Sequence, residues 1–179
     1  MSIEERLVAL ESRLSQLEDE QAIAQLVASY GPLVDAGLPD EVAGLWTADG
    51  VYDVDEMYLG DQEAVRAMVA GEDHQGLIRR GAAHFLGPAQ VTVTGDTARA
   101  VCHSVLVVHH RDKFFLARAG AHLFSLVRAT SGSPEPGDDT RGWRIQHRTT
   151  RVLDGREESR ALLGAGVTGV GLPETHRPR

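Results

Sequence analysis

The feature that most constrains the fold is a change in the period of the hydrophobic pattern along the chain. Up to about residue 34, apolar side chains recur every three or four positions, as on one face of a helix. From residue 89 onward they alternate with polar ones, and the segments 97–110, 113–130 and 143–153 are long enough for long strands. Helices followed by strands predict an α+β fold, in which helices pack on one face of a curved antiparallel sheet.

Shorter segments fit the same plan. Turn residues at 47–50 precede a short predicted strand at 51–54, and a helix follows Gly60-Asp61. Residues 72–80 are polar and are predicted to be a loop. The Gly, Ser and Pro residues at 131–142 predict a hairpin loop between two of the long strands, and a short helix is expected at 157–163.

The chain is predicted to form one domain with two appendages. Its 179 residues suffice for one sizeable core, and no internal repeat or linker divides them. Residues 1–18 form an N-terminal helix, residues 19–163 the domain itself, and residues 164–179 a glycine-rich tail with little core.

The N-terminal helix carries a short heptad pattern. Its apolar side chains alternate in steps of four and three, at Ile3, Leu7, Leu10, Leu14 and Leu17. Two heptads are too short for a free-standing coiled coil, so this apolar row packs on the body or on a neighbouring subunit. We favour the subunit contact and expect a homo-oligomer, either a dimer or a trimer.

Charge and composition limit which partners and which location can be expected for this chain. A net charge of −8 disfavours nucleic acid, because the chain offers no basic surface to neutralise phosphates. No apolar run approaches the roughly 18 residues of a membrane span, and the first residues do not look like a signal peptide. The single Cys102 excludes an intramolecular disulfide, so a cytoplasmic location is expected.

Three side chains suggest chemistry. Tyr30 and Asp35 come at the end of the first helix, and His84 lies in the apolar run 81–88. A carboxylate beside an imidazole fixes its tautomer and makes it a usable base at neutral pH, and a nearby phenol can donate a hydrogen bond. Each residue also has an ordinary explanation: a helix-end aspartate, a core histidine and a packing tyrosine. The pair Asp35 and His84 together favours a catalytic dyad.

The order of several short motifs resembles a known family. A Tyr-x-x-x-x-Asp helix end precedes Leu-Trp-Thr-Ala-Asp-Gly-Val-Tyr at 45–52, Ala-His at 83–84, and Gly-Trp-Arg-Ile at 142–145 with Arg148 beyond. The chain resembles the NTF2-like superfamily in its SnoaL-like and scytalone dehydratase-like branch, and within it the bile acid 7α-dehydratases most. That resemblance implies a cone-shaped fold with one pocket.

The resemblance also implies site residues. It assigns catalysis to Tyr30, Asp35 and His84, and it places His109 where scytalone dehydratases have a second active-site histidine. Of the paired tyrosines of those enzymes, only Tyr52 has a possible counterpart, so their substrate does not transfer. His109 lines the pocket if the odd positions of strand 97–109 face inward, and His122 on the next strand is a further candidate for substrate binding.

These features together predict a dehydratase that needs no cofactor. The substrate would be a small apolar, ring-containing hydroxy-carbonyl compound, such as a steroid or polyketide. The histidines show no metal-ligand spacing, so no metal is expected. An isomerase of the ketosteroid type or a polyketide cyclase would use the same residues. A non-catalytic binding or subunit module is the alternative of a different class.

Overall fold

The computed structural model describes residues 1–129 and 140–171, and they form an α+β structure. The helices are α1 (Ile3–Asp35), α2 (Pro39–Ala43), α3 (Gln62–Ala70), α4 (Glu72–Arg80) and α5 (Glu157–Thr168). The strands are β1 (Trp46–Val54), β2 (Met57–Leu59), β3 (Ala82–Leu86), β4 (Gln90–Thr94), β5 (Thr97–His110), β6 (Lys113–Arg128) and β7 (Trp143–Val152).

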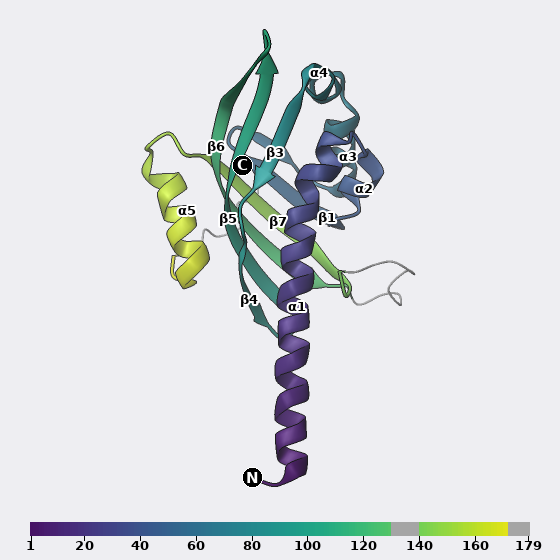
Figure 1. Ribbon diagram of the computed structural model, residues 1–179, viewed down its shortest axis with the longest axis vertical. Helices are drawn as coiled ribbons and strands as arrows, with labels where there is room; N and C mark the ends of the chain where they lie inside the picture. Colours follow the sequence, from purple (N-terminus) through teal and green to yellow (C-terminus); the bar gives the residue numbers. More distant parts are fainter. Residues whose placement is uncertain (130–139, 172–179) are drawn as a thin grey trace.

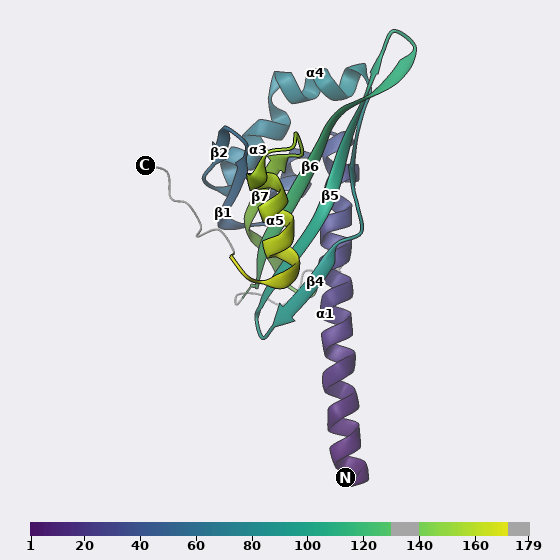
Figure 2. The same ribbon diagram turned by 90° about the vertical axis from the view of Figure 1, so that its left-hand side faces the viewer.

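One bent sheet organises the molecule. Its strand order is β2-β1-β7-β6-β5-β3, and β4 also pairs with β5. Helix α1 crosses one face of the sheet with α2, α3 and α4 around its C-terminal end, while α5 packs against the other face (Figures 1 and 2). The predicted α+β class, with helices around a curved sheet, is confirmed. The pairing is antiparallel except between β1 and β7, which run parallel.

The core lies between α1 and the sheet. The helical stripe of Ile23, Leu26 and Val27 is fully buried in one cluster with Phe124 and Trp143 from β6 and β7. On the opposite face a smaller cluster joins Leu162 of α5 to the sheet. Both faces of the central strands are therefore covered by packed side chains.

Helix α1 is continuous across the predicted boundary at residue 18. It begins with a capping box, in which the Ser2 hydroxyl accepts from the backbone N–H of Glu5 and the Glu5 carboxylate accepts from the backbone N–H of Ser2. Burial begins at Asp19, whose carboxylate accepts hydrogen bonds from Arg128, Arg141 and Trp143. The segment before it extends well beyond the body (Figure 1).

Three predicted elements differ in the structure, and a fourth cannot be compared. Residues 72–80 form helix α4, because acidic residues in its first turn and Arg79 and Arg80 in its last turn favour the helix dipole where apolar periodicity is weak. Residues 47–50 belong to β1, which has a register shift against β7 instead of a turn. Helix α5 extends to Thr168, so the predicted tail begins too early. Most of the loop predicted at 131–142 lies outside the described residues.

A glycine permits the closest approach between α1 and the sheet. Strand β3 runs directly over α1, and a Cβ atom added at Gly31 would lie 2.1 Å from the carbonyl oxygen of His84. Real Cβ atoms do not approach backbone that closely, so only glycine fits here. Gly31 therefore sets the distance between the helix and the strand that carries His84.

Substituting Gly31 by alanine should destabilise the protein by at least about 2 kcal/mol, because backbone must move to admit the methyl group. Chemical denaturation measures this change in the free energy of unfolding. Gly164→Ala is the matched control: it also lies in a helix, but a Cβ there meets no atom within 4 Å, so it should be neutral or stabilise by about 0.5–1 kcal/mol. Equal effects of both substitutions would contradict the close-approach explanation.

Candidate active site

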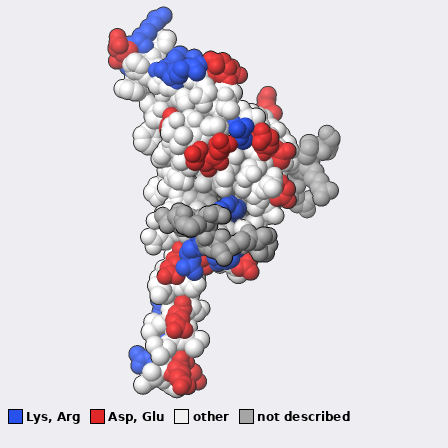
Figure 3. Space-filling model, turned by 90° about the vertical axis from the view of Figure 1, so that its right-hand side faces the viewer, with Lys and Arg blue, Asp and Glu red and all other residues white. Residues whose placement is uncertain are grey.

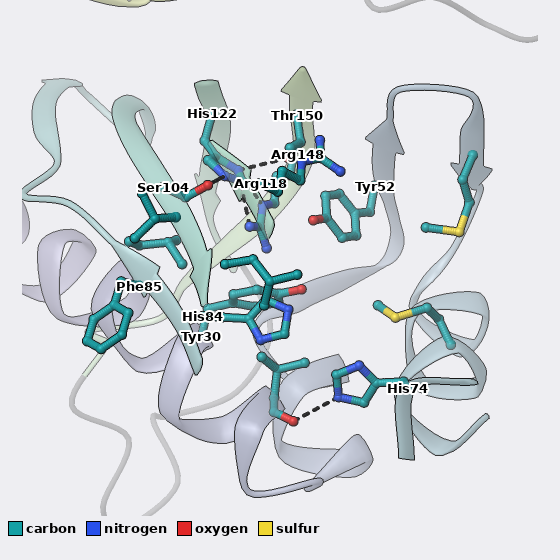
Figure 4. A pocket seen from close by; sticks show the side chains of 16 residues that line it. Tyr30, Tyr52, His74, His84, Phe85, Ser104, Arg118, His122, Arg148 and Thr150 are labelled. Atoms are coloured by element: carbon teal, nitrogen blue, oxygen red, sulfur yellow. Dashed lines mark hydrogen bonds between the residues drawn. The ribbon is translucent and has the colours of Figure 1, made fainter. Parts of the chain in front are cut away.

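A cavity opens between the C-terminal end of α1 and the sheet, with about 660 Å³ of space including its open mouth. Its walls combine apolar, aromatic and histidine side chains with two arginines (Figure 4). The lining residues are Tyr30, Val34, Tyr52, Met57, Met68, His74, His84, Phe85, Leu86, Ser104, Val105, Leu106, Arg118, His122, Arg148 and Thr150.

Asp35 and His84 are brought together at one end of this cavity. Asp35 is the last residue of α1, and its carboxylate accepts from His84 twice: from Nδ1 at 2.5 Å and from the backbone N–H at 2.7 Å. Because a carboxylate only accepts, Nδ1 carries the proton. The lone pair is then on Nε2 of a ring that lines the cavity. The dyad has the geometry of an oriented general base.

The surroundings of His84 keep the imidazole neutral. Burial lowers its pKa below the ordinary value of 6.5, and the proximity of His74 and the charge of Arg148 act in the same direction. The Asp35 carboxylate raises the pKa and only partly offsets burial. The Nε2–H of His74 donates to the backbone carbonyl of Val34 at 2.9 Å. At neutral pH, His84 is therefore an unprotonated base.

Arg148 is a site residue that the sequence indicates only as part of a motif. Its side chain is fully buried on β7, with its guanidinium carbon 3.9 Å from the ring centre of Tyr30 and 4.4 Å from that of Tyr52. Its Nη1 atom is buried and has no hydrogen-bond partner among the described residues. A buried cation with a free donor beside a cavity is suited to receive negative charge.

His122 holds this arginine in place. Its Nδ1 accepts from Nε and Nη2 of Arg148, at 3.3 and 3.1 Å, and from the Thr150 hydroxyl at 2.8 Å. Its Nε2–H therefore donates to Ser104 Oγ, at 2.6 Å. Burial and the charge of Arg148 lower the pKa of His122 well below 6.5. The predicted substrate ligand His122 does line the cavity, but both ring nitrogens are already engaged.

The two tyrosines form an aromatic wall. The rings of Tyr30 and Tyr52 lie 6.4 Å apart, nearly perpendicular, and both pack against Trp46. Burial raises the pKa of the Tyr30 phenol above its ordinary value of 10, so the hydroxyl stays protonated. Both predicted tyrosines thus line the cavity, and Tyr30 is available as a hydrogen-bond donor.

His109 is not where the prediction places it. In the first half of β5 the even positions face inward: Ala100 and Cys102 lie in the core and Ser104 lines the cavity, where Val105 and Leu106 join it. Val101, on the odd face, instead packs in the cluster beneath α5. His109 shares that odd face, is absent from the cavity lining, and packs against Phe114 with ring centres 5.1 Å apart. The condition under which His109 would line the cavity is therefore not met at His109 itself.

In residues 1–129 and 140–171, no three His, Cys, Asp or Glu side chains are grouped so that they could hold a metal ion. Over the same ranges, no helix combines the length and hydrophobicity that a membrane crossing requires.

Comparison with known proteins gives matches over most of the chain. The model of a SnoaL-like domain family matches residues 15–149. The crystal structure of an NTF2-like protein with a cystatin-like fold from Novosphingobium aromaticivorans is 39% identical, covering 88% of this chain and 96% of that one, with a TM-score of 0.80.

Two more distant structures share the fold. Rv3472 from Mycobacterium tuberculosis is 18% identical over 88% of this chain and 90% of its own, with a TM-score of 0.65. Aln2 from a Streptomyces species is 17% identical over 74% and 88%, with a TM-score of 0.58. A search of curated proteins found no match.

The histidines with lowered pKa predict a pH-dependent stability. Burial is the main cause of the lowered pKa at His84, His122 and His147, so the unfolded chain binds protons more readily than the folded one near pH 6. The free energy of unfolding should therefore rise with pH up to about 6.5, the ordinary histidine value.

Denaturant titrations between pH 5 and 7 test this slope. His122→Gln, which keeps a donor and an acceptor, should flatten the slope by up to about 1.4 kcal/mol per pH unit, the value for one proton. His109→Gln, outside the cavity, should leave it unchanged. A slope that His122→Gln does not alter would show that His122 is not held neutral by the fold.

Proposed function

The chain belongs to the SnoaL-like domain family, and from that premise we propose that it is a cofactor-independent dehydratase. The wider superfamily includes polyketide cyclases and dehydratases as well as members without catalytic activity. In our proposal His84 is the base, Asp35 orients it, and Tyr30 with Arg148 stabilises the negative charge that develops on the substrate. The substrate is an apolar, ring-containing hydroxy-carbonyl compound.

The observation that carries this proposal is the double hydrogen bond between Asp35 and His84 at the cavity wall. A binding or subunit module gains nothing from an ionisable pair held in one tautomer beside an open cavity. The lowered pKa of His84 supports the role of a base, because the imidazole is neutral and its Nε2 lone pair is free at neutral pH.

A second group of residues supports the electrophilic half of the reaction. The phenol of Tyr30 and the guanidinium of Arg148 lie against each other at the cavity wall. Both groups are hydrogen-bond donors, and the phenol of Tyr30 keeps its proton at neutral pH because burial raises its pKa. Donors that are fixed before the reaction stabilise an enolate oxygen without the cost of reorienting water.

The proposed steps are balanced in protons. His84 Nε2 takes a proton from a carbon next to the substrate carbonyl, and the electron pair moves to the carbonyl oxygen as an enolate. Collapse of the enolate forms a carbon–carbon double bond and expels the hydroxyl group. The imidazolium of His84 returns its proton to that hydroxyl, which leaves as water, and the dyad is restored.

An isomerase or a cyclase would share the first step, so the products decide between the classes. Elimination releases water and lowers the mass of the organic product by that of one water molecule. Isomerisation returns the same proton to another carbon without a change in mass. Cyclisation without water loss also leaves the mass unchanged but forms a new ring bond. A binding module would leave every compound intact.

Replacing His84 by alanine should lower the turnover of any substrate found by about 10²–10⁴-fold, because the base is removed. The assay incubates a panel of ring-containing hydroxy-ketones with the protein and follows loss of water by mass spectrometry. His109→Ala is the matched control, since that histidine lies outside the cavity, and it should retain activity. Equal activity of the His84→Ala variant and the unmodified protein would refute the proposed base.

The pH profile gives an independent test of the dyad. The rate should rise with pH through the pKa of His84, which lies below 6.5, because only the neutral ring accepts a proton. Asp35→Asn should lower the rate and move this rise to lower pH, because the carboxylate that favours the imidazolium is gone. A shift to higher pH would contradict the assignment of Asp35 as the partner of His84.

A further inference from the structure

The projecting part of α1 presents a row of uncovered apolar side chains. Each of its five heptad residues is more than half exposed; they are Ile3, Leu7, Leu10, Leu14 and Leu17. The segment extends away from the body in both views (Figures 1 and 2), so nothing in the described chain covers this row. Of the two alternatives left by the sequence, packing on the chain's own body therefore finds no support in residues 1–129 and 140–171.

The row points away from the body of its own chain. At 100° per residue, the heptad residues lie on roughly the opposite side of α1 from the buried stripe that includes Ile23, Leu26 and Tyr30. The same outer line continues along the body as the exposed residues Gln21 and Ala28. Two α1 helices that meet along this face would therefore carry their two bodies on opposite sides of the pair.

Charged residues flank the row asymmetrically. Glu4, Glu11 and Glu18 follow the apolar positions on one side, and Arg6 and Arg13 precede them on the other. The space-filling view shows uncharged surface between the acidic and the basic side chains of this segment (Figure 3). In heptad terms the acidic residues occupy e positions and the arginines g positions, the sites that set orientation in coiled coils.

We propose that this surface pairs with a second copy of the same chain, as a parallel two-stranded coiled coil that continues past Leu17 along the exposed Gln21 and Ala28 and is thus longer than the two heptads alone. In a parallel pair, the basic side of one helix faces the acidic side of the other, and Arg6 lies opposite Glu11 of the partner subunit. In an antiparallel pair like charges face each other, Arg with Arg and Glu with Glu. The charge pattern therefore selects both the occupant and its orientation.

Two features of the chain support the parallel pairing of α1 with a second copy. The capping box at Ser2 and Glu5 secures the first turn, so the free end is a formed helix before any partner arrives. Glu18 is already paired with Arg141 of its own body, which ties the end of the projecting segment to the domain. The pair between Arg6 and Glu11 is consequently the one whose charges are free to act between subunits.

Light scattering on the full chain tests whether the row forms the contact. The unmodified protein should be a dimer, and Leu10→Glu should make it a monomer, with a loss in dimer affinity of at least about 100-fold, because a charge enters the apolar contact. Ser12→Glu, on the side of the same turn that faces away from the heptad row, should remain a dimer. A monomeric unmodified protein, a trimer, or a dimer that survives Leu10→Glu would each overturn the proposal.

Charge reversal tests the orientation. Arg6→Glu and Glu11→Arg should each weaken the dimer by roughly three- to tenfold, since each places like charges opposite each other twice. The double variant carrying both changes restores opposite charges only in a parallel pair, so its affinity should return to that of the unmodified chain. A double variant as weak as either single one would refute the parallel arrangement. Circular dichroism checks that each variant is folded.

Discussion

The carboxylate of Asp35 is the contact on which the site depends. It accepts from both the ring and the backbone of His84, so it joins the end of α1 to the edge strand β3. The backbone bond fixes where the strand lies, and the ring bond fixes which nitrogen faces the cavity. Gly31, one turn earlier, makes that distance possible because it has no side chain. Removing the carboxylate would thus disturb a backbone position as well as a tautomer.

Arg148 places a buried positive charge at the cavity wall, away from the Asp35–His84 dyad. Burying a cation costs several kcal/mol unless its donors are satisfied. Here the described residues give it an imidazole nitrogen and two tyrosine ring faces, but Nη1 remains without a partner. Its charge contributes to keeping His84 and His122 neutral. The cavity therefore has a basic nitrogen at one side and an uncompensated cation at the other, a polarity suited to moving electrons from a C–H bond toward an oxygen.

The sequence predicts the fold well and the site in part. The change from helical to alternating period is a local property, so the long elements can be read directly. Helix α4 cannot, because end charges rather than an apolar face stabilise it. Alternation also cannot say which face of β5 turns inward, so the sequence leaves the position of His109 open, and the structure places it outside the cavity lining. Arg148 is hard to select from sequence because an isolated arginine in a strand reads as exposed until its partners are known.

The two ends of helix α1 have different roles: one contributes to the cavity and the other carries the exposed heptad row. Its last turns bury one face in the body and end at Tyr30 and Asp35, while its first turns carry the heptad row on the other face. From Leu17 to Tyr30 the helix rises about 20 Å, and the ion pairs of the buried Asp19 with Arg128 and Arg141 lie between them. A contact at the first turns therefore cannot reach the dyad by direct packing. Oligomer formation and the chemistry of the cavity should vary independently, because Asp19 anchors the helix to the sheet between them.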